Sequence, residues 1–517
     1  MQKPINAARC GAVGVIKDLG TPDLPMTAWT DARNIRFLDG SAYQFLGHGK
    51  VYDSPSFAPQ YLLPVNVAGA RYWLYATAGK QFVVSNASGL STHTDISHLT
   101  ARAGAVNQWS GTVFGGIPIL NAGDGLTVPM FWNQSLAAKF TDLTAWPAST
   151  YCKVIRSYKN LLIALNITKG AVNYPFMVKW SNLAVPGSLP STWNPADTTQ
   201  DAGEFDIGDG QDPIVDGLGL KESFIVYKES STYAIDYIGG VFVLKARKVF
   251  GMSGLLNKNC AVDLDSFHFA VTGYDIVIHD GYTSSSILDK KARRHFFQSI
   301  DVENKGKVFC FKNPFLNEVL VAYPSIGSTS CDTALVYNYV DKTVSFRSLP
   351  NLNHAAFGPV DKSLGGNWNQ DSDPWSSDMT AWNGPDYTPD TARVIMGSAD
   401  IKLFMLDASA SFDGALPVAY LERRGLDVGA AHRMKVITGI RPHIDGNVGQ
   451  TVIVKIGFAN DPYAEPTYTS ATYTIGTTLQ CDLIVTGRYL AVRFETGSAF
   501  SWRLDSFDLF VQDAGAF

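Results

Sequence analysis

Four runs of sequence lie close together between Trp180 and Gly281: KESFIVYK (221–228), TYAIDY (232–237), FHFAV (267–271) and YDIVIHDG (274–281). They are short, apolar or alternating, and rich in β-branched and aromatic residues. Gly, Asn and Asp interrupt them, and helical spacing of apolar residues is nearly absent. This pattern is typical of consecutive strands joined by hairpin turns. The chain is therefore predicted to be all-β.

The same pattern recurs on both sides of this stretch. Groups of strands follow one another roughly every 40 to 60 residues, which is about the length of a four-stranded propeller blade. We predict a β-propeller of six or seven blades over residues 53–415, because closing the ring removes exposed sheet edges. A series of two-sheet sandwiches is the alternative architecture.

The first part of the chain, residues 1–52, is predicted to be an extended N-terminal arm that feeds a first hairpin. Pro22 and Pro25 exclude a helix and a central strand there, and Asp39-Gly40 is a good hairpin turn. Trp29 has little local structure to bury it. We therefore expect the arm to dock on the body and to supply a strand that helps close the ring, with Trp29 as the anchor. The alternative is a flexible arm that orders only on meeting a partner protein.

The last part of the chain, residues 416–517, carries the runs TVIVKIG (451–457) and YLAVRF (489–494). Apolar and polar residues alternate along them, so one face of each strand is apolar. This indicates a small C-terminal antiparallel β-sandwich domain.

Composition limits the classes of partner. Charged residues make up 17% of the 517 residues and the net charge is −5. The low charge content favours contact with other subunits, and the net charge gives no reason to expect tight nucleic-acid binding. The six cysteines form no C-x-x-C pair, so buried free thiols are expected. Neither a signal peptide nor a membrane span is predicted.

A basic run gives the candidate assembly contacts. The clearest predicted helix covers Ile287 to Ile300, and it contains four charged residues close together: Lys290, Lys291, Arg293 and Arg294. A solvated helix face is the plain interpretation of such a run. Contact with a neighbouring subunit or with nucleic acid is the functional one, and Trp29 joins the four basic residues as a candidate assembly contact.

Motifs that carry chemistry are missing. There is no H-E-x-x-H, no Walker loop and no G-x-S-x-G. The segment DIGDGQD (206–212) superficially resembles a calcium loop but lacks ligands at the required alternate positions. We predict no catalytic, cofactor-binding or metal-binding residue, and no cofactor.

A polar insertion, residues 362–391, interrupts the strand pattern. It contains four large aromatic residues among Asp, Asn, Ser and Gly: Trp368, Trp375, Trp382 and Tyr387. A loop of this length is usually functional or a contact surface, and its tryptophans either anchor an interface or pack on their own domain.

Patches along the whole chain carry a family resemblance. They are LPMTAWTDARNIRF (24–37), IVYKES (225–230), YDIVIHDG (274–281) and GRYLAVRF (487–494) followed by Trp502-Arg503-Leu504. With these patches the chain resembles the tail hub or nozzle proteins of short-tailed double-stranded DNA bacteriophages, also described as tail tubular protein B-like or DNA-stabilisation-type. The insertion at 362–391 departs from the family pattern.

The resemblance implies a structural virion protein and not an enzyme. Six copies are expected to form a ring that extends the portal–adaptor channel through which the genome leaves. Expected partners are other copies of the chain, tail adaptor or portal-side proteins, tail fibres or spikes, and viral DNA that passes without tight binding. The expected location is the phage tail, after assembly in the cytoplasm of the host bacterium.

Two other functions compete with this one. The first is a carbohydrate-binding or receptor-binding β-propeller of a phage tail, although the long fibrous repeats of adhesins are not seen. The second is a cytoplasmic propeller scaffold, which is disfavoured because no blade carries a regular repeat signature.

Overall fold

The computed structural model describes residues 3–67, 69–85, 92–240, 242–360, 392–409, 411–416, 418–429, 431–497 and 500–516. The insertion predicted at 362–391 therefore lies outside the described residues. Almost all regular structure is strand, which confirms the all-β prediction. The helical elements among the described residues are short: α1 (Arg293–Ser299) and the 3-10 turns η1 (Thr21–Asp23), η2 (Lys305–Lys307) and η3 (Pro314–Leu316).

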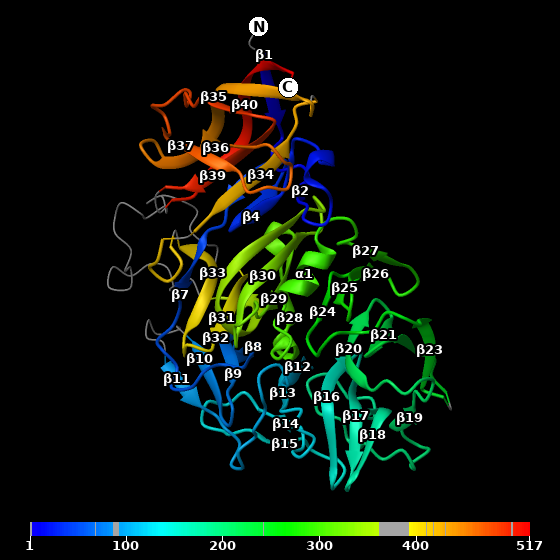
Figure 1. Ribbon diagram of the computed structural model, residues 1–517. Coiled ribbons are helices and arrows are strands. Elements are labelled where there is room, and N and C mark those ends of the chain that lie inside the picture. The colour runs from blue at the N-terminus through cyan, green and yellow to red at the C-terminus, as the bar shows by residue number, and fades with distance from the viewer. Residues whose placement is uncertain are drawn as a thin grey trace.

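Five antiparallel four-stranded sheets follow one another along the chain (Figure 1). The strands of each sheet run from the innermost outward in chain order. They are β8 (Tyr61–Val67), β9 (Ala70–Ala76), β10 (Gln81–Ser85) and β11 (Thr92–Asp95); β12 (Ser110–Phe114), β13 (Ile117–Asn121), β14 (Met130–Phe131) and β15 (Thr141–Asp142); β16 (Thr150–Tyr158), β17 (Leu161–Lys169), β18 (Val172–Trp180) and β19 (Gly203–Asp206); β20 (Ile214–Leu220), β21 (Ser223–Lys228), β22 (Thr232–Tyr237) and β23 (Leu244–Phe250); and β24 (Ala261–Asp263), β25 (His268–Val271), β26 (Ile276–His279) and β27 (Ser284–Ser286).

A sixth sheet has seven strands: β28 (Phe309–Asn313), β29 (Glu318–Tyr323), β30 (Cys331–Asn338), β31 (Val344–Pro359), β32 (Ala392–Ser398), β33 (Leu403–Ser409) and β7 (Gly47–Lys50). The long strand β31 pairs with β30 through its first part and with β32 through its second part. This sheet therefore contains two four-stranded portions that share β31.

The sheets surround a common axis. Within the described ranges, β8, β12, β16, β20, β24, β28 and β31 each pack against the next, and β31 packs against β8. Apolar clusters fill the space between neighbouring sheets, as where Ile163 of β17 and Val178 of β18 meet Phe224 and Val226 of β21. A closed circuit of inner strands with the core between the sheets is the propeller arrangement. The number of blades, six or seven, stays a prediction.

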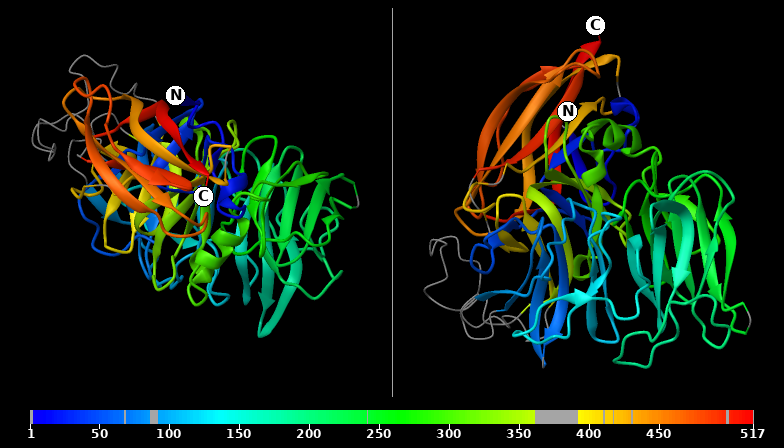
Figure 2. Two further views of the ribbon diagram at one scale, coloured as in Figure 1. Left: turned by 45° about the horizontal axis from the view of Figure 1, so that its top comes forward. Right: turned by 90° about the horizontal axis from the view of Figure 1, so that it is seen from below.

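Two further sheets form the sandwich, which stands at one end of the propeller (Figure 2). One contains β38 (Val485–Gly487), β35 (Arg433–Asp445), β40 (Arg503–Ala516), β6 (Ser41–Gln44) and β5 (Ile35–Leu38), with β1 (Lys3–Ala8) paired to β40. The other contains β37 (Thr467–Thr474), β36 (Thr451–Ala459), β39 (Tyr489–Thr496), β34 (Tyr420–Leu426) and β4 (Asp31–Arg33).

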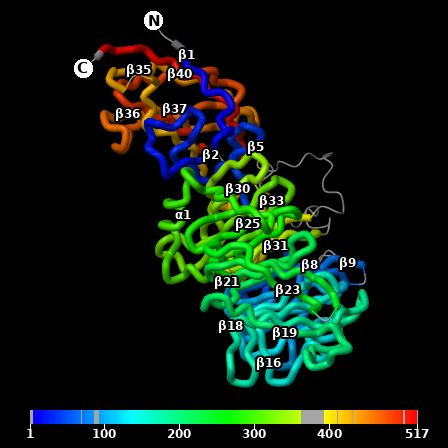
Figure 3. Tube along the Cα trace, turned by 90° about the vertical axis from the view of Figure 1, so that its right-hand side faces the viewer, coloured from blue at the N-terminus to red at the C-terminus, as the bar shows by residue number. Residues whose placement is uncertain are grey.

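The arm is built into both parts of the molecule. Strands β1, β4, β5 and β6 belong to the sandwich sheets, and the short pair β2 (Gly14–Val15) and β3 (Ala28–Trp29) lies beside them. Strand β7 instead pairs with β33 at the outer edge of the propeller. The division into an arm 1–52, a propeller 53–415 and a sandwich 416–517 stays a prediction, and the strands of the arm complete sheets of the other two units. Strands β1 and β40, from the two opposite parts of the chain, lie side by side at the far end of the sandwich (Figure 3).

A buried ion network joins the arm to the propeller. Arg36 of β5 donates to Glu318 of β29 at 2.6 and 3.1 Å and to Asp407 of β33 at 2.7 Å. Asp407 also accepts a hydrogen bond from Arg347 of β31 at 2.6 Å. Both guanidinium groups lie over the ring of Phe45, with their central carbons 4.5 and 4.7 Å from the ring centroid. The two arginines and the two carboxylates therefore compensate one another, and all four charges can be buried at the junction.

Candidate functional site

A cavity of about 320 Å³ lies on the propeller axis. Its walls come from β16, β20, β21, β24, β28 and β31. The polar and charged side chains among the lining are Arg156, Asp216, Tyr227, Asn259, Asp263, Lys312 and His354. Since the inner strands of a propeller bring distant parts of the chain together, these residues are far apart in sequence.

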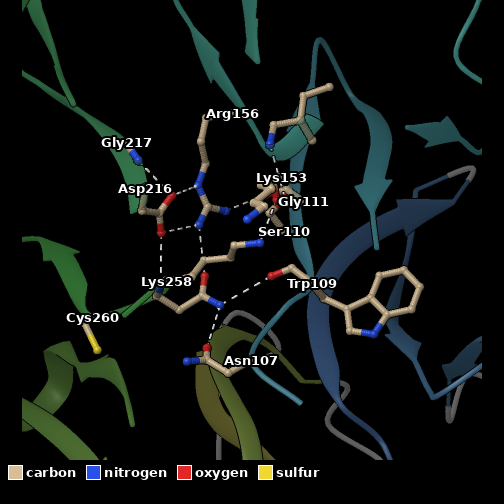
Figure 4. A network of polar contacts seen from close by, with 12 residues as sticks. Asn107, Trp109, Ser110, Gly111, Lys153, Arg156, Asp216, Gly217, Lys258 and Cys260 are labelled. Atoms are coloured by element: carbon tan, nitrogen blue, oxygen red, sulfur yellow. Dashed lines mark hydrogen bonds and ion pairs between the residues drawn. The ribbon is translucent and has the colours of Figure 1, made fainter. Parts of the chain in front are cut away.

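The centre of this lining is an ion pair between Arg156 and Asp216 (Figure 4). The guanidinium donates to the two carboxylate oxygens at 3.0 and 2.8 Å. Asp216 also accepts the backbone N–H groups of Gly217 at 2.8 Å and Asn259 at 2.9 Å. Burial alone raises the pKa of Asp216, but Arg156 and these donors hold it below its ordinary value. The carboxylate is therefore charged and fully engaged.

The ion pair continues into the connections between the sheets. Asn259 accepts from Arg156 at 2.9 Å and donates to Asn107 at 3.0 Å, and Asn107 donates to the carbonyl of Val308 at 3.0 Å. Lys258 donates to the carbonyl of Lys153 at 2.6 Å, and burial lowers its pKa to about 8. Because every one of these groups is partnered within the protein, the network ties the sheets together.

Tyr227, which lines the cavity, bridges two buried histidines. Its hydroxyl lies 2.8 Å from Nδ1 of His268 and 2.7 Å from Nε2 of His279. Nε2 of His268 lies 2.8 Å from the carbonyl of Gly219 and must donate to it. Nδ1 of His268 then accepts from the tyrosine, whose oxygen accepts from His279. Burial lowers the pKa of both histidines, that of His279 to about 3.

The segment that resembled a calcium loop surrounds a lysine. Lys228 is completely buried, and its ammonium contacts Asp212 at 3.0 Å and donates to the carbonyls of Ile207 at 3.3 Å and Asp209 at 3.1 Å. The positive charge in this loop is therefore supplied by the chain itself. No group of three or more His, Cys, Asp or Glu residues within the described ranges could hold a metal ion.

Trp29 lies inside the sandwich. Its side chain has no exposed surface, and its ring lies 6.3 Å from that of Phe494 on β39 and 6.2 Å from that of Phe507 on β40. The indole N–H donates to the carbonyl of Cys10 at 2.6 Å. Trp29 thus anchors the arm between the two sandwich sheets, whereas β7 supplies the strand to the propeller. The prediction that Trp29 is an assembly contact is therefore corrected, because the buried ring is not exposed to another subunit.

The basic run is divided between a turn and a helix. Helix α1 begins at Arg293 and not at Ile287 as predicted. Lys290 has a left-handed φ of 58° and is exposed, and the half-buried Lys291 donates to the carbonyl of Lys342. Burial lowers the pKa of Lys291. These two lysines therefore belong to the turn before the helix.

Arg293 and Arg294 are exposed on the helix. Arg293 lies 3.6 Å from Asp275 and 3.5 Å from Asp289. Asp18 of the arm accepts the backbone N–H groups of Arg294 at 2.7 Å and His295 at 3.2 Å, so it caps the helix. The structure places the four basic residues side by side at the surface where the arm meets the propeller, and leaves both arginine side chains accessible.

Sequence reasoning missed the polar networks. Arg156 and Asp216 each stand in a strand, 60 residues apart, and nothing local pairs them. The one available signal is a charged residue inside a strand that is otherwise apolar, such as Arg156 after Val154 and Ile155. Such a residue must find a buried partner, but the pattern does not say which.

Comparisons with known proteins do not assign the chain to a family. No protein family model matches the chain, and no curated protein matches it. A solved structure titled as a novel fungal alcohol oxidase of the AA5 family in complex with copper has 10% identity and a TM-score of 0.39, covering 89% of this chain and 93% of its own. The AfRom2 CNH domain has 11% identity and a TM-score of 0.28, covering 74% and 94%. Likenesses this weak carry no argument about activity. Within the described residues, no helix is long and apolar enough to cross a membrane.

Proposed function

We propose that this chain is a structural virion protein that forms the tail nozzle or hub ring of a short-tailed bacteriophage. The assignment to that class is supported by the sequence resemblance, whose longest patch, residues 24–37, spans β3, β4 and most of β5. In the proposed ring, six copies surround a channel for the genome, and the chain acts as a structural part and not as an enzyme.

The observation that best supports the ring is a set of exposed apolar side chains at the two ends of the outer strand β23 and beside it, here called the β23 rim. It consists of Ile238, Phe242, Met252 and Tyr282, which are 53, 75, 80 and 74% exposed. Ile238 and Phe242 flank one end of β23 and Met252 follows the other, while Tyr282 stacks on Arg247 of the strand at 4.9 Å. Exposed apolar groups that gather in this way mark protein contact sites, and a second copy is the proposed partner.

The rigid connection between propeller and sandwich supports a mechanical role. The arm pairs with both units, and the junction holds the buried charges of Arg36, Glu318, Arg347 and Asp407. A subunit of a channel has to keep its shape while DNA passes, and this construction resists bending between the two parts.

DNA is proposed to pass through the centre of the ring and not along the propeller axis, which the Arg156–Asp216 network crosses. The net charge of −5 suits passage without tight binding. Tail adaptor or portal-side proteins, and tail fibres or spikes, are the proposed neighbours. The proposed location is the virion tail, with assembly in the host cytoplasm.

Native mass spectrometry and negative-stain microscopy of the purified full chain test this proposal. The expected result is a six-membered ring with a central hole. Phe242→Asp should weaken it, because a charge then has to be buried in the contact. Val448→Asp is the matched control: Val448 is 80% exposed in the sandwich, away from β23. Isolated compact particles under all conditions, or equal effects of the two variants, contradict the ring.

A further inference from the structure

Three side chains in the axial cavity have hydrogen-bonding capacity that the protein does not use. Oδ1 of Asp263 is buried and has no partner among the described residues. Lys312 donates one N–H to the backbone carbonyl of Asp263 at 2.8 Å, which leaves two ammonium protons. Nδ1 of His354 accepts the backbone N–H of Leu62 at 3.2 Å, so the proton of the neutral ring is on Nε2.

His354 is held as a neutral donor. Its ring stacks on Phe309 at an interplanar angle of 13° and contacts Tyr61 at 4.5 Å between centroids. Burial, helped by the charge of Arg156, lowers its pKa to about 3. Within the described ranges no hydrogen bond uses Nε2, so this N–H is available to a guest in the cavity that His354 lines.

The charges around the cavity balance. Arg156 and Lys312 are positive, and Asp216 and Asp263 are negative. An anion would meet the unpartnered carboxylate oxygen of Asp263, and a cation would meet Lys312, so either would be desolvated beside a like charge. The rest of the lining is largely apolar and includes Phe357. The surroundings therefore favour a neutral guest that both donates and accepts hydrogen bonds.

We propose that the axial cavity binds a small neutral polyhydroxylated molecule, of the size of a monosaccharide or polyol. One hydroxyl donates to the carboxylate of Asp263, whose Oδ1 is buried and whose other oxygen is the accessible one, and others accept from Lys312 and from Nε2 of His354, while C–H groups lie against the apolar lining. A volume of about 320 Å³ stands at the lower end of the range of ligand pockets, about 300–1,000 Å³. Asp263 and Lys312 are only half-buried, so solvent reaches this side of the cavity. The site is independent of the proposed ring.

Ligand-observed saturation-transfer NMR and calorimetry on the full chain test the site, with glucose, galactose and glycerol as probes. Acetate and putrescine serve as the charged comparisons. Thermal shifts are unsuitable, because sugars stabilise proteins by exclusion from their surface. We expect at least one neutral probe to bind in the millimolar range and both charged probes to fail.

The variants are Asp263→Asn and Lys312→Met, with Asp265→Asn as the matched control on the exposed turn that follows β24. A hydrogen bond to a carboxylate is worth more than one to an amide, so Asp263→Asn should weaken binding about five- to tenfold. Lys312→Met should weaken it to a similar extent, and the control should leave it unchanged. Circular dichroism confirms that each variant is folded.

Three results overturn the proposal. The first is the absence of binding by any neutral probe at about 0.1 M, a weak-affinity limit, which means that the cavity holds water only. The second is preferential binding of acetate or putrescine. The third is affinity that is equal in the wild type and in folded Asp263→Asn and Lys312→Met.

Discussion

Replacing Arg36 with methionine should release the arm from the propeller. The change removes both hydrogen bonds to Glu318, at 2.6 and 3.1 Å, and the one to Asp407. Asp407 keeps Arg347, but Glu318, whose side chain is 1% exposed, loses its partner. Breaking a buried ion pair by removing one member costs about 3–5 kcal/mol, because the other charge stays buried and unpaired.

Hydrogen exchange of the amides in β5 and β6 measures this cost locally, since exchange from the protected state reports the free energy of opening. A loss of about 3–5 kcal/mol accelerates exchange by roughly two to nearly four powers of ten. Burial already raises the pKa of Glu318 in the intact protein, so in the variant the carboxyl should take up a proton readily. The acceleration should accordingly shrink as the pH is lowered and the carboxyl becomes neutral.

The double variant Arg36→Met with Glu318→Gln separates this explanation from a simple loss of packing. With no charge left unpaired, it should recover most of the protection. Lys159→Met is the control, because its partner Glu222 is 90% exposed and such surface pairs contribute little. An acceleration below tenfold for Arg36→Met, or a double variant as fast as the single one, would refute the reasoning.

Three other outcomes are expected. Trp29→Ala should lower the free energy of unfolding by roughly 3–5 kcal/mol in urea titration, and a loss below about 1 kcal/mol would contradict its place between the sandwich sheets. Reversing Arg293 and Arg294 to Glu should weaken ring assembly in native mass spectrometry; intact rings with altered DNA retention would contradict the assignment. The folded state keeps His279 neutral with a pKa of about 3, so the unfolded state binds its proton first as the pH falls below about 6.5. Unfolding free energy should then fall with decreasing pH between about 6.5 and 3, by at most about 1.4 kcal/mol per pH unit for this group. His279→Gln should make the unfolding free energy depend less on pH in this range. An unchanged slope would contradict the role assigned to His279.

The local sequence pattern was sufficient to predict the strands. The run 221–228 was expected to be a strand, and β21 covers Ser223–Lys228 with five of its six residues buried. Asp39 and Gly40 both have positive φ, 52° and 81°, as the expected hairpin turn between β5 and β6 requires. These features depend on neighbours in sequence, which is why they could be predicted.

The position of the arm could not be predicted in the same way. Burial of Trp29 followed from its size, but its partners, Phe494 and Phe507, are more than four hundred positions away, and no periodicity encodes that pairing. The start of α1 has a similar origin. Asp18 of the arm caps the helix at Arg294 and His295, and this long-range contact helps to set where the helix begins.

The candidate site was the least predictable part. A propeller axis collects one or a few residues from each inner strand, so Arg156, Asp216, Asp263, Lys312 and His354 share a cavity without sharing a motif. Each of them has an ordinary appearance in its own strand. Only the closure of the ring shows that they meet.

The pairing of β1 with β40 has a consequence for synthesis. Asn6 contacts Asp508, which is 502 positions later, and at the usual speed of about 5–20 residues per second a ribosome needs roughly 25–100 s to cover that distance. Strand β1 is therefore made long before its partner β40. Until β40 is synthesised, β1 remains an unpaired strand that is open to wrong pairing, and a chaperone that covers it would protect the nascent chain.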